Sequence, residues 1–297
     1  MEYEVVAAVV AALLGAAPET VRPLREGGYS DTGRWSVTLP GGRTAFVKAE
    51  QPPRADGWGV AVERLVYATV DSPHLPALVA YEPGGGDVPR VLVTEDLSAA
   101  AWGAPVTAAD AVALRQALTA LGSVAAFPGL AEPAHVPAWA DDPSPLVACG
   151  LVDAAWTVHV PVLAAAAVEA DPAGDRLVHR DLWLQNWCRL PGRGAVVVDW
   201  AGASSGNPAA MLAMGEAGVR AAGGPGGHVL AAGHPEWAAW MAGLAAGWLA
   251  GPVPPIPRLL ETMRREAVAS LRWACDELAL PYPVSSAEIA SVGPWRP

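Results

Sequence analysis

The residues best suited to chemistry stand in one short run near the middle of the chain. It reads His179-Arg-Asp-Leu-Trp-Leu-Gln-Asn186 and fits the pattern H-R-D-L-x-x-x-N at every defined position. Thirteen residues later, four apolar residues end on Asp199, as a buried strand would. Phosphoryl transfer needs a carboxylate that takes the proton of the attacking hydroxyl and hard oxygen ligands for Mg²⁺. Asp181 is the candidate base, Asn186 and Asp199 are the candidate metal ligands, and His179 would support the loop through hydrogen bonds.

A second group of candidate residues lies upstream. The run Thr-Ala-Phe-Val-Lys48 has the form of a strand that ends in a phosphate-binding lysine, and Lys48 is the only lysine of the chain. Glu63 follows fifteen residues later on an expected helix, where it could orient that lysine as an ion pair. The turn Glu-Gly-Gly-Tyr-Ser-Asp of residues 26–31 could bring backbone N–H groups to phosphate oxygens, and its candidate nucleotide-binding residues are Gly27, Gly28 and Ser30.

The elements that would position these residues follow two patterns. Up to about residue 95 the chain alternates short apolar runs with glycine turns, which is typical of strands. After residue 97 helical periodicity dominates. The expected strands are 21–26, 34–39, 43–49, 78–81, 90–94, 176–178 and 195–198. The expected helices are one ending near Gly15 and those at 58–70, 107–121, 146–170, 209–222, 235–250 and 258–280, the third opened by a capping box at Thr107 and Asp110.

Composition excludes several classes of protein. The chain has 297 residues, with 30 acidic against 19 basic side chains, and this net charge of −11 argues against a nucleic-acid partner. The three cysteines are far apart, which favours unpaired thiols and a cytoplasmic setting. The longest uncharged apolar window, residues 237–256, is interrupted by glycines and prolines, so we expect no membrane span. A small strand-rich lobe would join a larger helical lobe near residues 94–98, with a ligand cleft between them.

The order of these motifs resembles the aminoglycoside phosphotransferase family, which has a protein-kinase-like fold. The resemblance covers about residues 20–220. It implies an α+β, two-lobed fold with a small antiparallel-sheet N-lobe, residues 1–96, and a larger, mainly helical C-lobe, residues 97–297. It also implies ATP or GTP with Mg²⁺ as cofactors and a hydroxyl of a small molecule, often an antibiotic, as acceptor.

By motif, the resemblance implies that Asp181 is the catalytic base and that Asn186 and Asp199 bind magnesium. Lys48 would bind phosphates with Glu63 behind it. The run Val-Thr-Glu-Asp-Leu of residues 93–97 resembles the hinge, where the main chain of Glu95 and Leu97 would meet the adenine.

The chain departs from the family pattern at three positions. Arg180 stands where the family usually has glycine, and Asn207 and Met211 replace two acids that often follow the second metal ligand. Loss of the second acid weakens the case for a rigid catalytic loop. It leaves the residues assigned to chemistry in place.

The acceptor is less defined by the sequence. Trp183 and Trp200 flank the catalytic groups and could stack on a sugar or base. Seven acids and no Lys or Arg lie between residues 132 and 175, among them Asp141, Asp142 and Asp153, and they would either attract a cationic substrate or form an ordinary solvated surface.

We expect phosphorylation of an aminoglycoside-like or nucleoside-type antibiotic, giving resistance or self-protection. The alternatives are a metabolic kinase for choline, homoserine, a fructosamine or a sugar, and a catalytically silent nucleotide-binding homologue. A protein kinase is disfavoured because no A-P-E-like segment follows Asp199.

Overall fold

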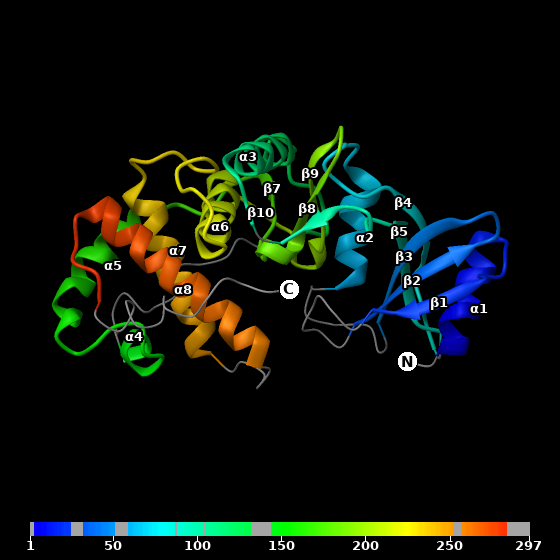
Figure 1. Cartoon of the computed structure of the whole chain (residues 1–297), viewed down its shortest axis with the longest axis horizontal. Helices are drawn as coiled ribbons and strands as arrows, with labels where there is room; N and C mark the ends of the chain where they lie inside the picture. The colour runs from blue at the N-terminus through cyan, green and yellow to red at the C-terminus, as the bar shows by residue number, and fades with distance from the viewer. Residues whose placement is uncertain are drawn as a thin grey trace.

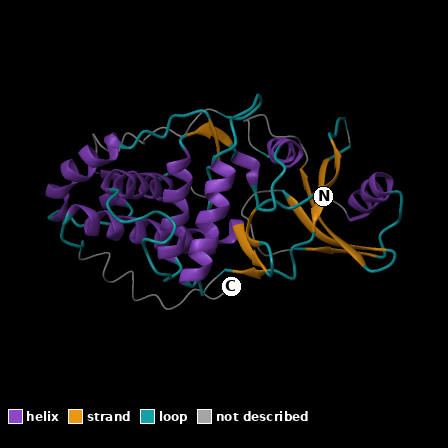
Figure 2. Ribbon diagram, turned by 90° about the horizontal axis from the view of Figure 1, so that it is seen from above, coloured by secondary structure: helices purple, strands orange, loops and turns teal. Residues whose placement is uncertain are grey.

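An antiparallel sheet lies at one end of the molecule and a group of packed helices at the other (Figures 1 and 2). This confirms the expected α+β architecture with a sheet-based N-lobe and a helical C-lobe. The computed structural model describes residues 3–24, 32–50, 59–86, 88–103, 105–131, 144–251 and 257–283. Among the helices in these ranges, none has the length and apolar character that crossing a membrane would require.

The N-lobe sheet has five strands in the order β1-β2-β3-β5-β4, each antiparallel to its neighbours. Gly41 and Gly42 make the turn between β2 and β3, and both have a positive φ that glycine adopts without strain. The strands are β1 (Thr20–Pro23), β2 (Gly33–Leu39), β3 (Arg43–Glu50), β4 (Leu78–Glu82) and β5 (Arg90–Glu95).

Two helices cover the two faces of this sheet. Helix α1 (Tyr3–Leu14) buries Val6 and Val10 against one face, in a cluster that includes Trp35 and Val47. Helix α2 (Val60–Thr69) lies on the other side, between the sheet and the C-lobe (Figure 1). Strand residues alternate between faces, so the positions flanking Trp35 and Val47 face α2 and the C-lobe.

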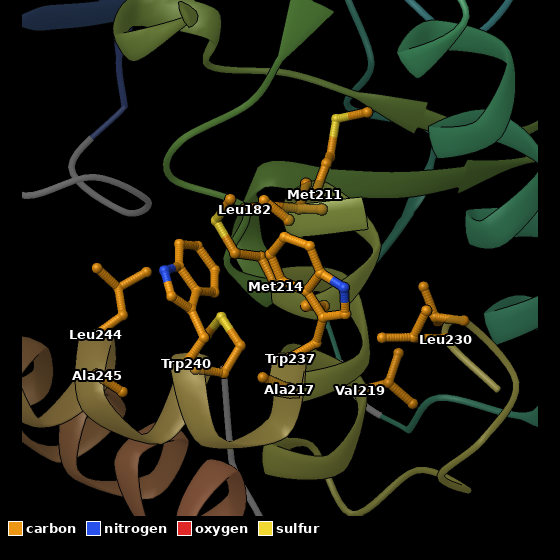
Figure 3. Packing of buried hydrophobic residues seen from close by; sticks show 14 of the residues in the cluster. Leu182, Met211, Met214, Ala217, Val219, Leu230, Trp237, Trp240, Leu244 and Ala245 are labelled. Carbon is orange, nitrogen blue, oxygen red and sulfur yellow. The ribbon is translucent and has the colours of Figure 1, made fainter. Parts of the chain in front are cut away.

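The C-lobe combines helices with two short sheets. Strands β6 (Ala101–Trp102), β8 (Trp187–Leu190) and β9 (Gly194–Val197) form one sheet, and β7 (Arg176–Val178) pairs with β10 (Ser204–Gly206). The helices are α3 (Ala108–Gly122), α4 (Ser144–Ala148), α5 (Val160–Glu169), α6 (Pro208–Ala221), α7 (Pro235–Ala250) and α8 (Pro257–Leu278). Their apolar faces meet in one core, where Trp237 and Trp240 of α7 lie beside Met214 of α6 (Figure 3).

Most elements lie where the sequence predicts them, and the capping box at Thr107 and Asp110 is confirmed. The single helix expected over 146–170 is wrong. The chain instead leaves α4, passes Gly150 at a φ of 72°, and starts a 3-10 turn (Trp156–His159), in which the N–H of Trp156 donates to the Asp153 carboxylate. The strands β6, β8 and β10 lie where the sequence analysis expects no strand.

Arg193, in the turn between β8 and β9, ties the C-lobe to the end of the N-lobe sheet. Its guanidinium donates to both carboxylate oxygens of Glu95 at 2.7 and 2.8 Å and to the carbonyl oxygens of Pro73 and Leu75 at 2.9 and 2.7 Å. The N–H of Val197 adds a bond to the carbonyl of His74. The planar guanidinium has enough donors to satisfy all of these acceptors at once.

Replacement of Arg193 by alanine should therefore loosen the junction between the lobes. Several charge-assisted hydrogen bonds disappear together, and we expect the free energy of unfolding to fall by about 2 kcal/mol. Urea titration followed by circular dichroism measures this change. Arg115→Ala, on the exposed side of α3, is the matched control and should stay within about 0.5 kcal/mol of the parent protein. An Arg193→Ala variant as stable as this control would contradict the bracing role.

Candidate active site

His179 organises the catalytic loop that follows β7. Its side chain is 1% exposed, and its ring packs edge-on against Trp200. Nδ1 accepts the N–H of Asp181 at 3.1 Å, and Nε2 lies 2.9 Å from the carbonyl oxygen of Val198. A carbonyl can only accept, so Nε2 carries the proton and the ring is the neutral tautomer. One imidazole thus links the loop before Asp181 to the strand before Asp199.

The Asp181 carboxylate is held by two side chains of the same loop. The indole N–H of Trp183 donates to Oδ1, and the Asn186 amide nitrogen lies 3.4 Å from Oδ2 and 2.6 Å from the main-chain oxygen of Asp181. Burial, together with the negative charge of Asp199, raises the pKa of Asp181 to about 6. A carboxyl with this pKa is mainly ionised at neutral pH and still basic enough to take a proton.

Asp199 stands at a sharp turn after β9. Its φ of 62° and ψ of 51° place it in the left-handed region, which Asp tolerates better than most residues. The turn continues as a 3-10 helix (Trp200–Gly202), and the carbonyl of Ala201 accepts the N–H of Gly59 at 2.9 Å, directly before α2. The turn that aims Asp199 therefore also holds the start of the helix that carries Glu63.

Lys48 joins the two lobes at the centre of the site. Its ammonium is 2.7 Å from Oε2 of Glu63 and 2.6 Å from Oδ1 of Asp199, and the Lys48 side chain is 4% exposed. Tyr67, one turn along α2, donates its hydroxyl to the other oxygen of Glu63 at 2.8 Å. The structure thus brings together the lysine, the helix glutamate and the strand-end aspartate that the sequence predicts.

The charges of this cluster fix its protonation. Burial alone would lower the pKa of Lys48, but the charges of Asp199 and Glu63 outweigh it and raise that pKa. Burial alone would raise the pKa of Asp199, yet the Lys48 ammonium holds it below its usual value, whereas burial keeps the pKa of Glu63 above its own. Asp199 is therefore ionised, as a metal ligand must be.

The donor set fits a magnesium ion that arrives with a nucleotide. Within the described residues there is no group of three or more His, Cys, Asp or Glu side chains that could hold a metal. Mg²⁺ typically uses one or two protein ligands and completes its shell with waters and substrate phosphates. The amide nitrogen of Asn186 contacts Asp181, so the amide oxygen of Asn186 is the atom that could coordinate Mg²⁺. Asp199 could supply a second, anionic oxygen.

Met211 and Asn207, the two departures from the family pattern, both have local roles. The sulfur of Met211 lies 3.5 Å from the backbone nitrogen of His179, and its side chain is fully buried in the cluster that Figure 3 draws. A thioether is a weak acceptor, and here it lies at the backbone N–H of His179. Asn207 caps α6 by accepting the N–H of Ala209 and donates to the carbonyl of Asp171.

A small cavity opens beside the catalytic loop, with a volume of about 20 Å³, roughly that of one water molecule. Trp183, Leu184 and Gln185 line one side, and α6 and α8 line the other. Glu266 of α8 reaches into it with a 3% exposed side chain, and its Oε2 has no hydrogen-bond partner among the described residues. Burial and the charge of Asp181 raise the pKa of Glu266 well above its usual value.

The residues predicted to contact the acceptor differ in where the structure places them. Trp183 lines this cavity, but the prediction for Trp200 is contradicted: its side chain is 0% exposed and its indole N–H is bonded to the carbonyl of Val197, so it belongs to the core. The Asp153 carboxylate accepts the N–H of Trp156, and none of the described acids of the segment 132–175 lines the cavity; these are Asp153, Glu169, Asp171 and Asp175. Asp141 and Asp142, together with Gly27, Gly28 and Ser30 of the glycine turn, lie outside the described residues.

The two residues predicted to form the hinge lie where the sheet passes into the C-lobe. Glu95 ends β5 opposite Ala45, with its side chain on Arg193, and the carbonyl of Leu97 accepts the N–H of Ala100 and the indole N–H of Trp102.

The sequence analysis did not identify Arg34 and Glu266 as candidate site residues. The signal for Arg34 was its position in the strand that pairs with the lysine strand; Glu266 has no local motif.

These features define the class of a two-lobed, kinase-like phosphotransferase. The model of the family described as "Phosphotransferase enzyme family" matches residues 20–260, so the chain belongs to that family. None of the curated protein sequences matches the chain.

Solved structures of small-molecule kinases share the fold. Spectinomycin phosphotransferase APH(9)-Ia, in complex with ADP and spectinomycin, is 14% identical, with 98% of each chain covered and a TM-score of 0.56. A protein assigned as a fructosamine-3-kinase from Thermobifida fusca is 21% identical over 90% of this chain and 98% of its own, with a TM-score of 0.54. Choline kinase LicA from Streptococcus pneumoniae is 11% identical over 93% and 98%, with a TM-score of 0.53.

The buried neutral imidazole makes stability depend on pH in a defined direction. Burial lowers the pKa of His179 to about 4, below its ordinary value of 6.5. As the pH falls, the unfolded chain takes up the proton first, so the stabilising contribution present above pH 6.5 is lost between pH 6.5 and 4. This loss amounts to about 3 kcal/mol.

Denaturant titrations at several pH values test this prediction. In His179→Asn the decline in free energy of unfolding over that pH interval should be smaller than in the parent protein by this amount. Arg115→Ala, the exposed control used above, should retain the parent slope. Equal slopes for the parent and His179→Asn would show that the imidazole is not held neutral.

Proposed function

We propose that this protein is a Mg²⁺-dependent, ATP- or GTP-dependent O-phosphotransferase acting on a small amino alcohol of the aminoglycoside antibiotic type. The observation that carries the proposal is the ion-pair cluster of Lys48, Glu63 and Asp199 beside a hydrogen-bonded Asp181. It supplies, at one place, a cation for phosphates, an ionised metal ligand and a base. Resistance or self-protection is the role that suits such an activity.

Each residue has a distinct part in the proposed transfer. Asp181 orients the acceptor hydroxyl and takes its proton as the new P–O bond forms and the bond to the nucleoside diphosphate breaks. Asn186 and Asp199 hold Mg²⁺, which, when bound, neutralises charge on the phosphate oxygens. Lys48 binds the phosphates, Glu63 keeps Lys48 in place, and the main chain at Glu95 and Leu97 receives the base.

The proposed acceptor class follows from Glu266. Burying a carboxyl oxygen without a hydrogen-bond partner, as for Oε2 of Glu266 among the described residues, costs free energy. The cavity beside it has room for one group the size of a water molecule or an ammonium. An ammonium entering there would ionise Glu266 and pair with it, while the rest of the acceptor, including its hydroxyl, lies toward Asp181. A choline, fructosamine, homoserine or neutral sugar or nucleoside acceptor is the alternative.

The same proposal extends to location and organisation. The three cysteines are unpaired, which supports a cytoplasmic setting. The division into an N-lobe of residues 1–96 and a C-lobe of residues 97–297 is supported by the end of β5 at Glu95, after which the next strand pairs with the C-lobe hairpin.

Asp181→Asn tests the chemical step. The amide keeps the shape of the side chain but cannot take a proton, so turnover should fall by about 100-fold to 10,000-fold. Binding of the nucleotide should be retained, because no phosphate contact is assigned to Asp181. The readouts are nucleoside diphosphate release and titration calorimetry with the Mg²⁺ nucleotide. Asp175→Asn, at an exposed loop carboxylate, should behave like the parent. Near-normal turnover of Asp181→Asn would refute the mechanism.

Glu266→Gln tests the acceptor class on a panel of spectinomycin, choline, a fructosamine, glucose and uridine. The neutral amide cannot pair with an ammonium, so the KM for the amine-bearing acceptor should rise about tenfold to 100-fold while the KM for the nucleotide stays constant. Glu261→Gln, at an exposed carboxylate of the same helix, is the control. If Glu266→Gln leaves the acceptor KM unchanged, or if only glucose or uridine is phosphorylated, the amino-alcohol assignment fails.

A further inference from the structure

Arg34 lies beside Lys48 on the neighbouring strand. The register of β2 and β3 pairs Arg34 directly with Lys48, so their side chains leave the sheet next to each other and on the same face. The next pair along, Trp35 and Val47, faces the opposite side and packs in the cluster under α1. Arg34 therefore points toward the C-lobe, as Lys48 does.

The guanidinium of Arg34 reaches the candidate metal ligand. Its Nη2 is 3.9 Å from Oδ2 of Asp199, and the Arg34 side chain is 11% exposed. Lys48 already holds the other oxygen of Asp199 at 2.6 Å. At 3.9 Å this contact is longer than a hydrogen bond, so Arg34 and Asp199 form an ion pair.

The guanidinium of Arg34 repels the ammonium of Lys48. The positive charge of Arg34 opposes that of Lys48, and Lys48 is already neutralised by two carboxylates. Two cations of the N-lobe sheet thus meet at one carboxylate, with Lys48 at one oxygen of Asp199 and Arg34 at the other. The arrangement is favourable once a polyanion enters and the carboxylate of Asp199 turns to a metal ion, because both cations then face phosphate oxygens.

We propose that Arg34 is a second phosphate-binding residue of the nucleotide site, which contacts the phosphate chain together with Lys48. This inference rests on the nucleotide-dependent function proposed above. Lys48 offers a compact point charge, whereas Arg34 offers a planar pair of N–H donors that can hold two phosphate oxygens. Arg34 would exchange its loose pairing with Asp199 for these oxygens when the Mg²⁺ nucleotide binds.

Titration calorimetry with a series of ligands tests the inference. The series is adenosine, AMP, ADP and ATP in excess Mg²⁺, or the guanosine series if the parent protein binds that instead. In Arg34→Met the Kd for the di- and triphosphate should rise about tenfold to 100-fold, the value expected for loss of a charge-assisted hydrogen-bonded pair. The Kd for the nucleoside should stay within about twofold, because the base and ribose do not meet Arg34. Arg34→Lys should show a smaller loss.

Arg43→Met is the matched control, because it removes an exposed arginine from the same hairpin. It should leave the whole series unchanged. If Arg34→Met changes the di- and triphosphate Kd by less than about twofold, or weakens the nucleoside equally, the inference is wrong while the proposed function stands. If the parent protein itself binds neither series, the proposed function and this inference both fail. Unchanged nucleoside binding also shows that the variant is folded.

Discussion

The contact between the Lys48 ammonium and the Asp199 carboxylate is the interaction on which the rest of this structure depends. It joins residues 151 positions apart and brings the N-lobe sheet against the C-lobe turn. A buried ammonium is tolerated only with anionic partners, and Glu63 is the second. The neighbouring elements hold the two residues in place. The N–H of Gly59, directly before α2, donates to the turn that follows Asp199, and Arg193 bonds to the main chain near the end of the sheet.

The loop that carries Asp181 is held by hydrogen bonds around a neutral imidazole. His179 uses both ring nitrogens, one on the Asp181 backbone and one on the strand that leads to Asp199, so the candidate base and the candidate metal ligand share one support. Because this support is an uncharged imidazole, it adds no charge to a place where the charges of Asp181 and Asp199 already interact. Met211 fits the same pattern, since a thioether below the loop avoids a third carboxylate there.

Most of the fold and the central residues could be predicted because their signals are local. The strand ending in Lys48, the His179–Asn186 run and the apolar run ending in Asp199 are each readable within a few residues. Arg34 and Glu266 could not be found in this way, since what marks them is a cross-strand partner and a cavity between distant helices. Trp200 was misassigned because proximity in sequence to Asp199 says nothing about which way an indole points. The expected helix over 146–170 failed where periodic apolar residues continued across a glycine turn.

The protonated, enclosed state of Lys48 has a consequence for the reactivity of the whole chain. Amine-directed reagents attack the neutral form of an amine, and the only side-chain amine of this protein is both charged and shut away between two carboxylates. In the folded state the Lys48 amine is therefore not available for acylation. Covalent labelling of that one side chain would therefore require the two lobes to separate. The rate of labelling at Lys48 would measure how often they do so.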